Sequence, residues 1–146
     1  MKWIIGCDHA GLPLKQVLHA ELLTWHDEVV DVGTHDTSSV DYPVFGHRVA
    51  SAVVAEPGTL GIVVCGSGIG ISIAANRVVG ARCALVQDAY AAALARQHND
   101  ANVIALGARL IGPGAAIAAV RAFRDTAFEG GRHARRVAML DEMDRP

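Results

Sequence analysis

The sequence predicts an α/β fold in which a parallel sheet is covered by helices on both faces. Short runs rich in Val and Ile alternate with longer Ala-rich stretches, and strands separated by helices pair in parallel through right-handed crossovers. Leu60–Cys65 is a nearly continuous apolar run, which is typical of a strand covered on both sides. We therefore expect a three-layer, doubly wound sheet of five parallel strands.

Each expected strand is a short apolar or β-branched run. The five runs are Lys2–Gly6, Glu28–Val32, Leu60–Cys65, Ala81–Val86 and Val103–Leu106. Because no repeat, linker or low-complexity segment separates them, residues 1–146 are expected to form one domain. Parallel strands bring their carboxyl ends to one edge of the sheet, and ligands bind beyond that edge. We therefore look for a functional site where the strands end.

The stretches between the strands have helical patterns. The first has Leu14, Leu18 and Leu22 on one side, as expected for a helix packed on a sheet. Pro43 suits a first helical turn, because the N–H that proline lacks would have no partner there. The expected helices are Leu12–Trp25, a helix beginning near Pro43, Ile69–Arg77, Asp88–Gln97, Pro113–Phe128 and His133–Asp144.

Composition and charge argue against several classes of function. The formal net charge is −2 and the basic residues form no long run, whereas nucleic acids and anionic membranes are bound by concentrated basic surfaces. The longest apolar stretch, residues 60–75, is shorter than the ~20 residues of a membrane-spanning helix. Three cysteines without CxxC spacing indicate neither a disulfide framework nor a zinc finger. We expect a cytoplasmic protein that binds neither nucleic acid nor membrane.

A glycine-rich loop, Gly66-Ser67-Gly68-Ile69-Gly70, follows the third expected strand. Glycines allow positive φ angles and leave backbone N–H groups uncovered, so such a loop can hold a phosphate or an oxyanion. A turn needed only for close packing is the plainer alternative. A dinucleotide-binding loop with Asp88 as the ribose-binding acid is disfavoured, because Ile71 stands at the third glycine position and the loop does not follow the first strand.

Cys65 ends the buried strand just before these backbone amides. A nearby helix N-terminus increases the thiolate fraction of a cysteine, and the thiolate is the reactive form. The alternative is an inert buried cysteine, and that is our interpretation of Cys7 and Cys83.

Two polar pairs allow either a structural or a functional interpretation. His98 and Asn99 follow a helical stretch and can form its C-cap, or His98 can be a proton donor that the negative helix end keeps charged. Asp8 and His9 follow the first strand and can cap the next helix. Asp8, His9 and His98 together are a conceivable metal site, but no HxH or HxxxH pair supports one.

Arg132 and Arg136 are spaced i, i+4, so both face the same way on a helix. Guanidinium groups match phosphate oxygens well. A solvated basic helix face is the alternative.

Taken together, these segments resemble the ribose-5-phosphate isomerase B family, which also includes galactose-6-phosphate isomerase subunits. Five segments carry the resemblance in family order: Gly6–Gly11, Asp41–Pro43, Cys65–Asn76, Arg96–Asn102 and Glu129–His133. The resemblance implies a Rossmann-like sheet and a C-terminal helix used in dimerisation. It also implies a homodimer or dimer of dimers with shared active sites, and a reaction that requires no cofactor and no metal.

The resemblance also implies residue roles. Cys65 matches the base that abstracts the carbon-bound proton, His98 matches the group that assists ring opening, and Ser67 helps to stabilise the enediolate. The residues implied in substrate binding are Asp8, His9, Tyr42, Gly66, Ser67, Gly68, Ile69, Gly70, Asn99, Arg109, Arg132 and Arg136, with the arginines on the phosphate.

Two positions depart from the family pattern. Ser67 stands where many cysteine-type members have Thr, and both residues supply a hydroxyl group. Ile71 stands where another branch of the family has a catalytic Glu, so the role of base falls to Cys65.

We therefore expect an isomerase of the pentose phosphate pathway that interconverts ribose 5-phosphate and ribulose 5-phosphate through a cis-enediolate. Galactose 6-phosphate or allose 6-phosphate is an alternative substrate, because the depth of the pocket cannot be read from the sequence. A non-catalytic sugar-phosphate-binding module and a thiol hydrolase with Cys65 as nucleophile are the alternatives from other classes.

Overall fold

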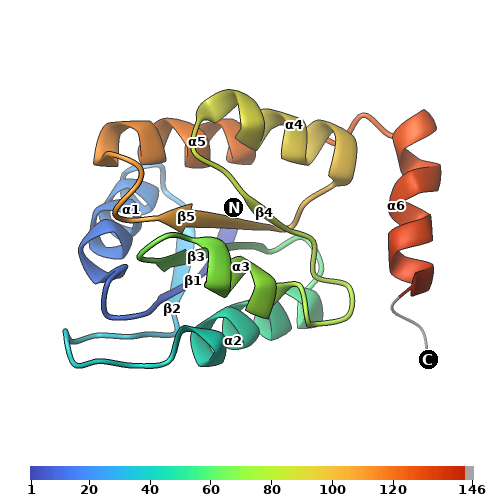
Figure 1. The fold of residues 1–146 in the computed structure, drawn as a ribbon. Helices are drawn as coiled ribbons and strands as arrows, with labels where there is room; N and C mark the ends of the chain where they lie inside the picture. Colours follow the sequence, from blue (N-terminus) through green and yellow to red (C-terminus); the bar gives the residue numbers. More distant parts are fainter. Residues whose placement is uncertain (144–146) are drawn as a thin grey trace.

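The computed structural model describes residues 1–143 and contains one sheet with helices on both faces (Figure 1). The strands are β1 (Lys2–Cys7), β2 (Glu28–Asp31), β3 (Leu60–Cys65), β4 (Cys83–Leu85) and β5 (Val103–Gly107). The helices are α1 (Leu12–Thr24), α2 (Tyr42–Ala55), α3 (Ile69–Ala75), α4 (Ala89–Asn99), α5 (Pro113–Asp125) and α6 (Arg132–Met143). The predicted five-stranded α/β fold is confirmed.

All neighbouring strands pair in parallel, in the order β2-β1-β3-β5-β4. The chain therefore winds outward from β1 in one direction to β2 and in the other direction to β3. Such a reversal opens a crevice beyond the carboxyl ends of the two central strands. Cys7 pairs with Val64 at that edge, so Asp8 and Cys65 leave the sheet side by side.

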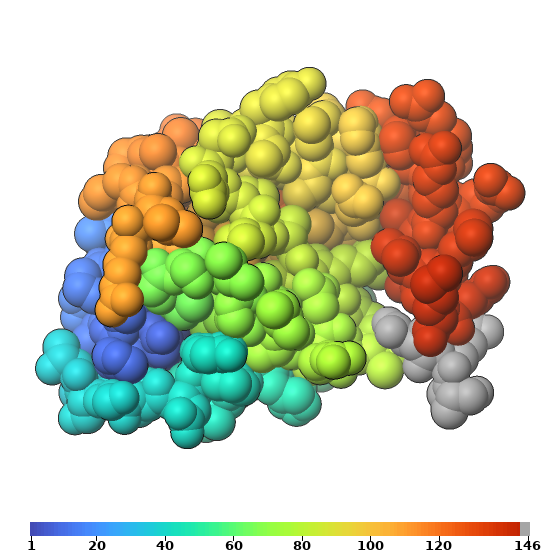
Figure 2. All heavy atoms as spheres, in the orientation of Figure 1, coloured from blue at the N-terminus to red at the C-terminus, as the bar shows by residue number. Residues whose placement is uncertain are grey.

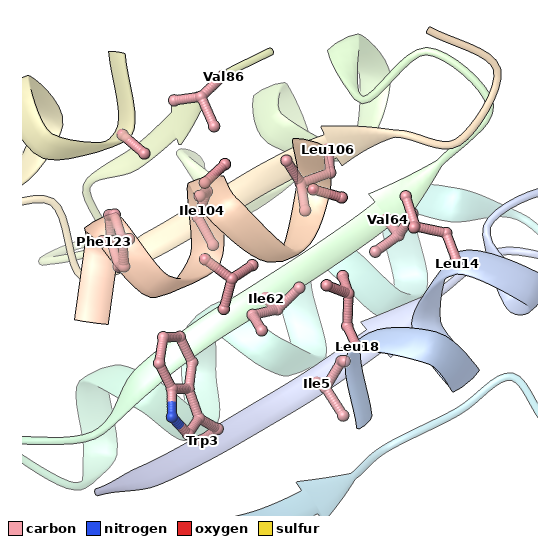
Figure 3. Close-up of a cluster of buried hydrophobic side chains, with 14 of the residues drawn as sticks. Trp3, Ile5, Leu14, Leu18, Ile62, Val64, Val86, Ile104, Leu106 and Phe123 are labelled. Carbon is pink, nitrogen blue, oxygen red and sulfur yellow. The ribbon is translucent and has the colours of Figure 1, made fainter. Parts of the chain in front are cut away.

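Alternate residues of the strands supply two separate cores. Trp3, Ile5, Ile62, Val64 and Ile104 belong to the larger cluster, which α1, α4 and α5 cover (Figures 1 and 3). The opposite face packs against α2 and α3 in a smaller cluster that includes Cys65. The buried pattern on both faces is what the continuous apolar run of β3 predicts.

Four predicted boundaries are wrong by two or three residues, and side-chain hydrogen bonds explain two of them. The side-chain amide of Asn76 bonds both backbone groups of Cys83, at 2.8 and 2.9 Å, and α3 stops at that point. β4 begins only at Cys83, because the N–H of Arg82 donates to the side chain of Asn102 at 2.8 Å.

The other two wrong boundaries are at helix C-termini. α4 extends two residues further than predicted, through Asn99, while α5 ends at Asp125 because Thr126 has extended backbone. The predicted last residue of α6, Asp144, lies outside the described residues.

α6 stands beside α4, apart from the sheet, at one end of the molecule (Figures 1 and 2). Only His133 and Val137 of α6 are buried, whereas Met139, Leu140 and Met143 are exposed. None of the helices within residues 1–143 combines the length and the apolar character needed to cross a membrane.

Candidate active site

An open hollow of about 390 Å³ lies beyond the carboxyl ends of β1 and β3. It brings together eight of the predicted site residues and adds Ala10 and Leu110, which sequence reasoning missed. The predicted residues that line it are Asp8, His9, Tyr42, Cys65, Gly66, Ser67, Gly70 and Arg109. Segments far apart in the sequence thus meet at one edge of the sheet, where blue, green and orange parts adjoin in Figure 2.

Cys65 is the last residue of β3, and its side chain lies at the inner wall of the hollow with 4% of the residue exposed. The backbone N–H of Gly68 donates to its Sγ at 3.1 Å. Gly68 can aim that N–H inward because its φ is +77°, a left-handed conformation that glycine adopts without strain. The loop therefore offers a fixed donor to a negatively charged sulfur.

Two other glycines of the loop make room for side chains of the hollow. A Cβ atom on Gly70 would lie 2.5 Å from Cζ of Tyr42, so the Tyr42 ring packs directly on this glycine. A Cβ on Gly66 would lie 3.4 Å from Cζ of Arg109, which shows that the guanidinium group lies beside the loop. The loop thus positions an aromatic hydroxyl and a cation as well as its own amides.

Ser67 keeps its hydroxyl near the backbone of the loop. Its Oγ accepts a hydrogen bond from the N–H of Ile69 at 3.3 Å. Ile69 itself has an exposed side chain and does not line the hollow.

Asp8 and His9 are each held by a backbone amide. The Gly11 N–H donates to Oδ1 of Asp8 at 2.9 Å, so Asp8 closes the turn before α1, whose N-cap position is Gly11. The Val40 N–H donates to Nδ1 of His9 at 3.2 Å. Since Nδ1 is an acceptor there, the neutral ring carries its proton on Nε2 and presents it as a donor.

The loop that includes Val40 is anchored by Lys15, a residue that sequence reasoning missed. The Lys15 side chain is 1% exposed, and its Nζ lies 2.7 Å from both carboxylate oxygens of Asp31 and 2.6 Å from the Thr34 carbonyl oxygen. The available signal was its spacing from Leu18 and Leu22, which places it on the inward face of α1. A buried lysine needs such partners.

The remaining predicted site residues lie near the amino ends of the strands, at the opposite end of the sheet from the hollow. His98 and Asn99 form the last turn of α4, which leads into the amino end of β5. The predicted C-cap is wrong by one residue, because Asp100 has the left-handed conformation, with φ 43°. Arg132 and Arg136 are exposed on α6 near that end of α4. Within one chain, therefore, Cys65 lies at the carboxyl ends of the strands and His98 lies near their amino ends.

His133 contacts both His98 and Arg132. Its ring stacks on that of His98, with centroids 4.3 Å apart and planes 6° from parallel. Nε of Arg132 lies 3.4 Å from Nε2 of His133. Burial, together with the neighbouring His98 and Arg132, lowers the pKa of His133. The sequence signal was its place next to Arg132 in a matching segment.

The structure also bears on the alternative roles considered above for the other cysteines, for Asp88 and for a metal site. Burial raises the pKa of Cys7 to about 11 and that of Cys83 to about 12, which fits inert thiols. Asp88 caps α4 by accepting the Ala91 N–H at 2.8 Å, so it has a structural role in place of a ribose-binding one. Asp8 and His9 lie far from His98, across the sheet, and cannot share a metal ion with it in one chain.

Comparisons with known proteins agree with this arrangement. The family model described as Ribose/Galactose Isomerase matches residues 3–140. The chain is 42% identical to ribose-5-phosphate isomerase B of Escherichia coli, and the match covers 98% of this chain and 96% of the relative.

Two solved structures are similar over nearly their whole length. Ribose-5-phosphate isomerase B from Clostridium thermocellum matches with a TM-score of 0.95 and 48% identity, over 99% of this chain and 97% of the other. The enzyme of the same name from Mycoplasma genitalium, solved with bound ribulose 5-phosphate, matches with a TM-score of 0.95 and 40% identity, over 98% and 95%. The chain therefore belongs to the ribose/galactose isomerase family.

Proposed function

We propose that this protein interconverts ribose 5-phosphate and ribulose 5-phosphate, with Cys65 as the base. The observation that carries the proposal is the Sγ of Cys65, which lies in the hollow with the Gly68 N–H 3.1 Å away. A sulfur in that position can act as a base, which takes up a proton and returns it without forming a covalent bond to the sugar. The ribulose 5-phosphate bound to the Mycoplasma genitalium relative supports the choice of substrate.

The proton transfer needs one base that works on two adjacent carbons. The Cys65 thiolate takes the proton from C2 of the open-chain aldose, and the C2–H electron pair forms the C1–C2 double bond of a cis-enediolate. The carbonyl oxygen O1 takes up the negative charge, and a proton then passes from O2 to O1. The electrons on O2 form the C2 carbonyl as the C1–C2 double-bond pair takes the proton back from the thiol at C1, which gives the ketose. We assign the stabilisation of this charge to the loop of residues 66–70, whose backbone amides and Ser67 hydroxyl follow Cys65 directly, because fixed donors of this kind stabilise oxyanions.

Ring opening requires His98, and the geometry supports its supply by a second copy of the chain. Cys65 and His98 are at opposite edges of the sheet in one chain, so the complete site combines the hollow of one copy with the α4–α6 corner of another. Two groups of exposed apolar side chains are available for such a contact: Ile69, Ile73, Leu85 and Leu110 on the part of the chain around the hollow, and Met139 and Leu140 on α6. Covering them stabilises a dimer, and we assign part of that contact to α6.

The phosphate binds where cations from both copies meet. Arg109 lies beside Gly66 in the hollow, and Arg132 and Arg136 point the same way from α6, next to His98. Tyr42, Asp8 and the Nε2–H of His9 then bind sugar hydroxyls, and Asn99 approaches from the second copy. Anchoring the non-reacting phosphate orients C1 and C2 toward Cys65.

A reactive free thiol suits a reducing compartment, so we place this activity in the cytoplasm. Residues 1–146 form one catalytic unit in this proposal, because both parts of the shared site are built on the same sheet.

The experiment is a panel of ribose 5-phosphate, galactose 6-phosphate and allose 6-phosphate, with turnover measured with and without a chelator. We expect fastest turnover of the five-carbon phosphate and no effect of the chelator. Faster turnover of a six-carbon phosphate would contradict ribose 5-phosphate as the substrate and identify that sugar phosphate instead. Loss of activity with the chelator would contradict the metal-free mechanism. Turnover of none of the three, with binding intact, would indicate a non-catalytic binding module.

A further inference from the structure

Three side chains at the α4–α6 corner form a cluster that the proposed reaction does not fully use. His98 and His133 stack there, and Oε2 of Glu129 lies 3.7 Å from Nε2 of His133. One nitrogen or oxygen atom from each of the three residues lies within 4.8 Å of the others. Among the His, Cys, Asp and Glu residues of positions 1–143, no other group of three is arranged this closely.

We propose that His98, Glu129 and His133 bind a divalent transition-metal ion such as Zn²⁺, and that the bound ion inhibits the enzyme. Two imidazole nitrogens and one carboxylate oxygen suit Zn²⁺ and its neighbours in the first transition row, whereas Mg²⁺ and Ca²⁺ prefer sites made only of oxygen. Three protein ligands leave a fourth position for water.

The cluster is built from one rigid residue and two that can adjust. His133 is 7% exposed and fixed in the first turn of α6, whereas His98 is half-buried and the Glu129 side chain is exposed. The Glu129 N–H donates to the Gln97 carbonyl oxygen at 3.1 Å, which holds this segment against α4. The three ligands therefore stay together even though the segments that carry them are separated in sequence.

Binding requires a small closure of the cluster. Zn–N and Zn–O distances of about 2.1 Å place tetrahedral ligand atoms roughly 3.4 Å apart, whereas the three ligand atoms lie within 4.8 Å of one another, so the longer separations must shorten. The two rings are nearly parallel, and one of them must turn for both lone pairs to meet the ion. His98, the more exposed ring, is free to make that turn.

Arg132 opposes the binding of a cation. Its Nε lies 3.4 Å from the same Nε2 of His133, so it shares the lone pair that the ion needs, and Arg136 adds positive charge on the same helix face. Arg132→Ala therefore strengthens metal binding. The same substitution removes a proposed phosphate ligand and weakens substrate binding, so the two effects have opposite signs.

Inhibition rests on the proposed function, whereas binding does not. A His98 nitrogen that is bonded to a metal ion cannot exchange a proton with the sugar ring oxygen. A bound ion therefore blocks ring opening while Cys65 and its loop remain intact.

The binding test uses Co²⁺, whose visible absorption reports its coordination, added to Cys65→Ser protein so that the active-site thiol cannot contribute. We expect a tetrahedral spectrum that Zn²⁺ displaces. Because changes in even the outer shell of a metal site cost about 10–100-fold in affinity, we expect Glu129→Gln and His133→Gln each to weaken binding at least about tenfold. His47→Asn, at an exposed histidine of α2, is the matched control and leaves binding unchanged. Equal Co²⁺ affinity in all of these proteins overturns the site.

The inhibition test measures ribose 5-phosphate turnover against Zn²⁺ concentration, with recovery after EDTA. Glu129→Gln keeps its turnover in the absence of Zn²⁺ but needs at least about tenfold more Zn²⁺ for half-inhibition. Undiminished inhibition of Glu129→Gln contradicts the proposal and places the inhibitory ion elsewhere, for example on Cys65. A protein that binds Co²⁺ as expected but turns over no sugar phosphate keeps the metal site and contradicts only the proposed function.

Discussion

The backbone N–H of Gly68 lies 3.1 Å from Sγ of Cys65. The two residues are three positions apart, and the left-handed φ of +77° at Gly68 turns the chain back so that the amide faces the sulfur. The same residue is the N-cap of α3. One backbone conformation thus aims a donor at the proposed base and starts the helix that follows the loop.

Gly68→Ala tests that conformation. The added Cβ would lie 2.6 Å from Cδ1 of Leu85 and 2.9 Å from the backbone of Leu106, and it would also strain a positive φ. Left-handed strain costs about 1–2 kcal/mol and overpacking about 1–3 kcal/mol more. We expect a marked loss of turnover together with a lower free energy of unfolding, measured by urea denaturation.

Gly58→Ala is the matched control for Gly68→Ala. Gly58 also has a positive φ, +88°, but a Cβ there meets nothing within 4 Å. The control therefore shares the strain without the crowding. Equal effects of the two substitutions on turnover would show that the Gly68 loop geometry is irrelevant to the reaction.

Alkylation with iodoacetamide at pH 8 distinguishes the three thiols. Because burial raises the pKa of Cys7 to about 11 and that of Cys83 to about 12, their thiolate fractions at pH 8 are only about 0.1% and 0.01%. We expect peptide mass spectrometry to find the label on Cys65 first, and bound ribose 5-phosphate to slow the labelling. Labelling of Cys83 as fast as Cys65 would contradict this ranking.

The sequence predicted the fold more completely than the site. Apolar runs such as Leu60–Cys65 depend on burial alone, so their pattern reveals the strands directly. Helix ends depend on single side chains, as the Asn76 hydrogen bonds to Cys83 show, and no periodicity reports such contacts. The sequence could therefore place each element but not the residues at which most of the helices end.

The candidate site, too, was only partly predictable from the sequence. Residues that follow strand ends, such as Asp8 and Cys65, were predicted together because parallel topology brings strand ends to one edge. The separation of His98 from Cys65 follows from the direction of α4, which runs away from that edge. Lys15 was missed because its partners Asp31 and Thr34 become neighbours only after β2 has paired with β1.

Mixing two inactive variants tests whether two copies share each site. If Cys65 comes from one copy and His98 from the other, a dimer of Cys65→Ala and His98→Asn has one site with both changes and one intact site. Random exchange of equal amounts makes about half of the dimers mixed, so about a quarter of the wild-type activity should return. Turnover after unfolding and refolding the mixture measures it; no recovery would indicate that each chain has a complete site.

We expect the buried Asp27 to contribute to stability at neutral pH and to lose this contribution in acid. Its carboxylate is 1% exposed and bonds Nε and Nη2 of Arg124 at 2.7 and 2.9 Å and Nε1 of Trp3 at 3.0 Å. The hydrogen bonds from Arg124, outweighing the opposing effect of burial, hold its pKa well below the usual range. A lowered folded-state pKa stabilises the fold above the unfolded-state pKa near 4, and this contribution is lost as the pH falls through the folded-state value.

Asp27→Asn should therefore lower the free energy of unfolding by about 3 kcal/mol at pH 7, because it removes the buried carboxylate of this ion pair and leaves Arg124 only the exposed Asp125. The difference from wild type should shrink below about pH 4. Glu56→Gln, which removes an exposed partner of Lys2, is the control and should change little at either pH. Urea denaturation at pH 7 and pH 3.5 measures both; a difference that does not depend on pH would contradict the role of the ionised carboxylate.

The most direct test of the mechanism is the exchange of the C2 proton of ribose 5-phosphate with deuterated solvent, followed together with turnover and substrate binding in Cys65→Ala. Positioned acid–base groups contribute about 10²–10⁴-fold to a rate, so we expect exchange and turnover to fall at least about a hundredfold while ribose 5-phosphate binds nearly as before. Cys83→Ala should exchange at the wild-type rate. Exchange in Cys65→Ala within about tenfold of wild type would contradict the assignment of Cys65 as the base.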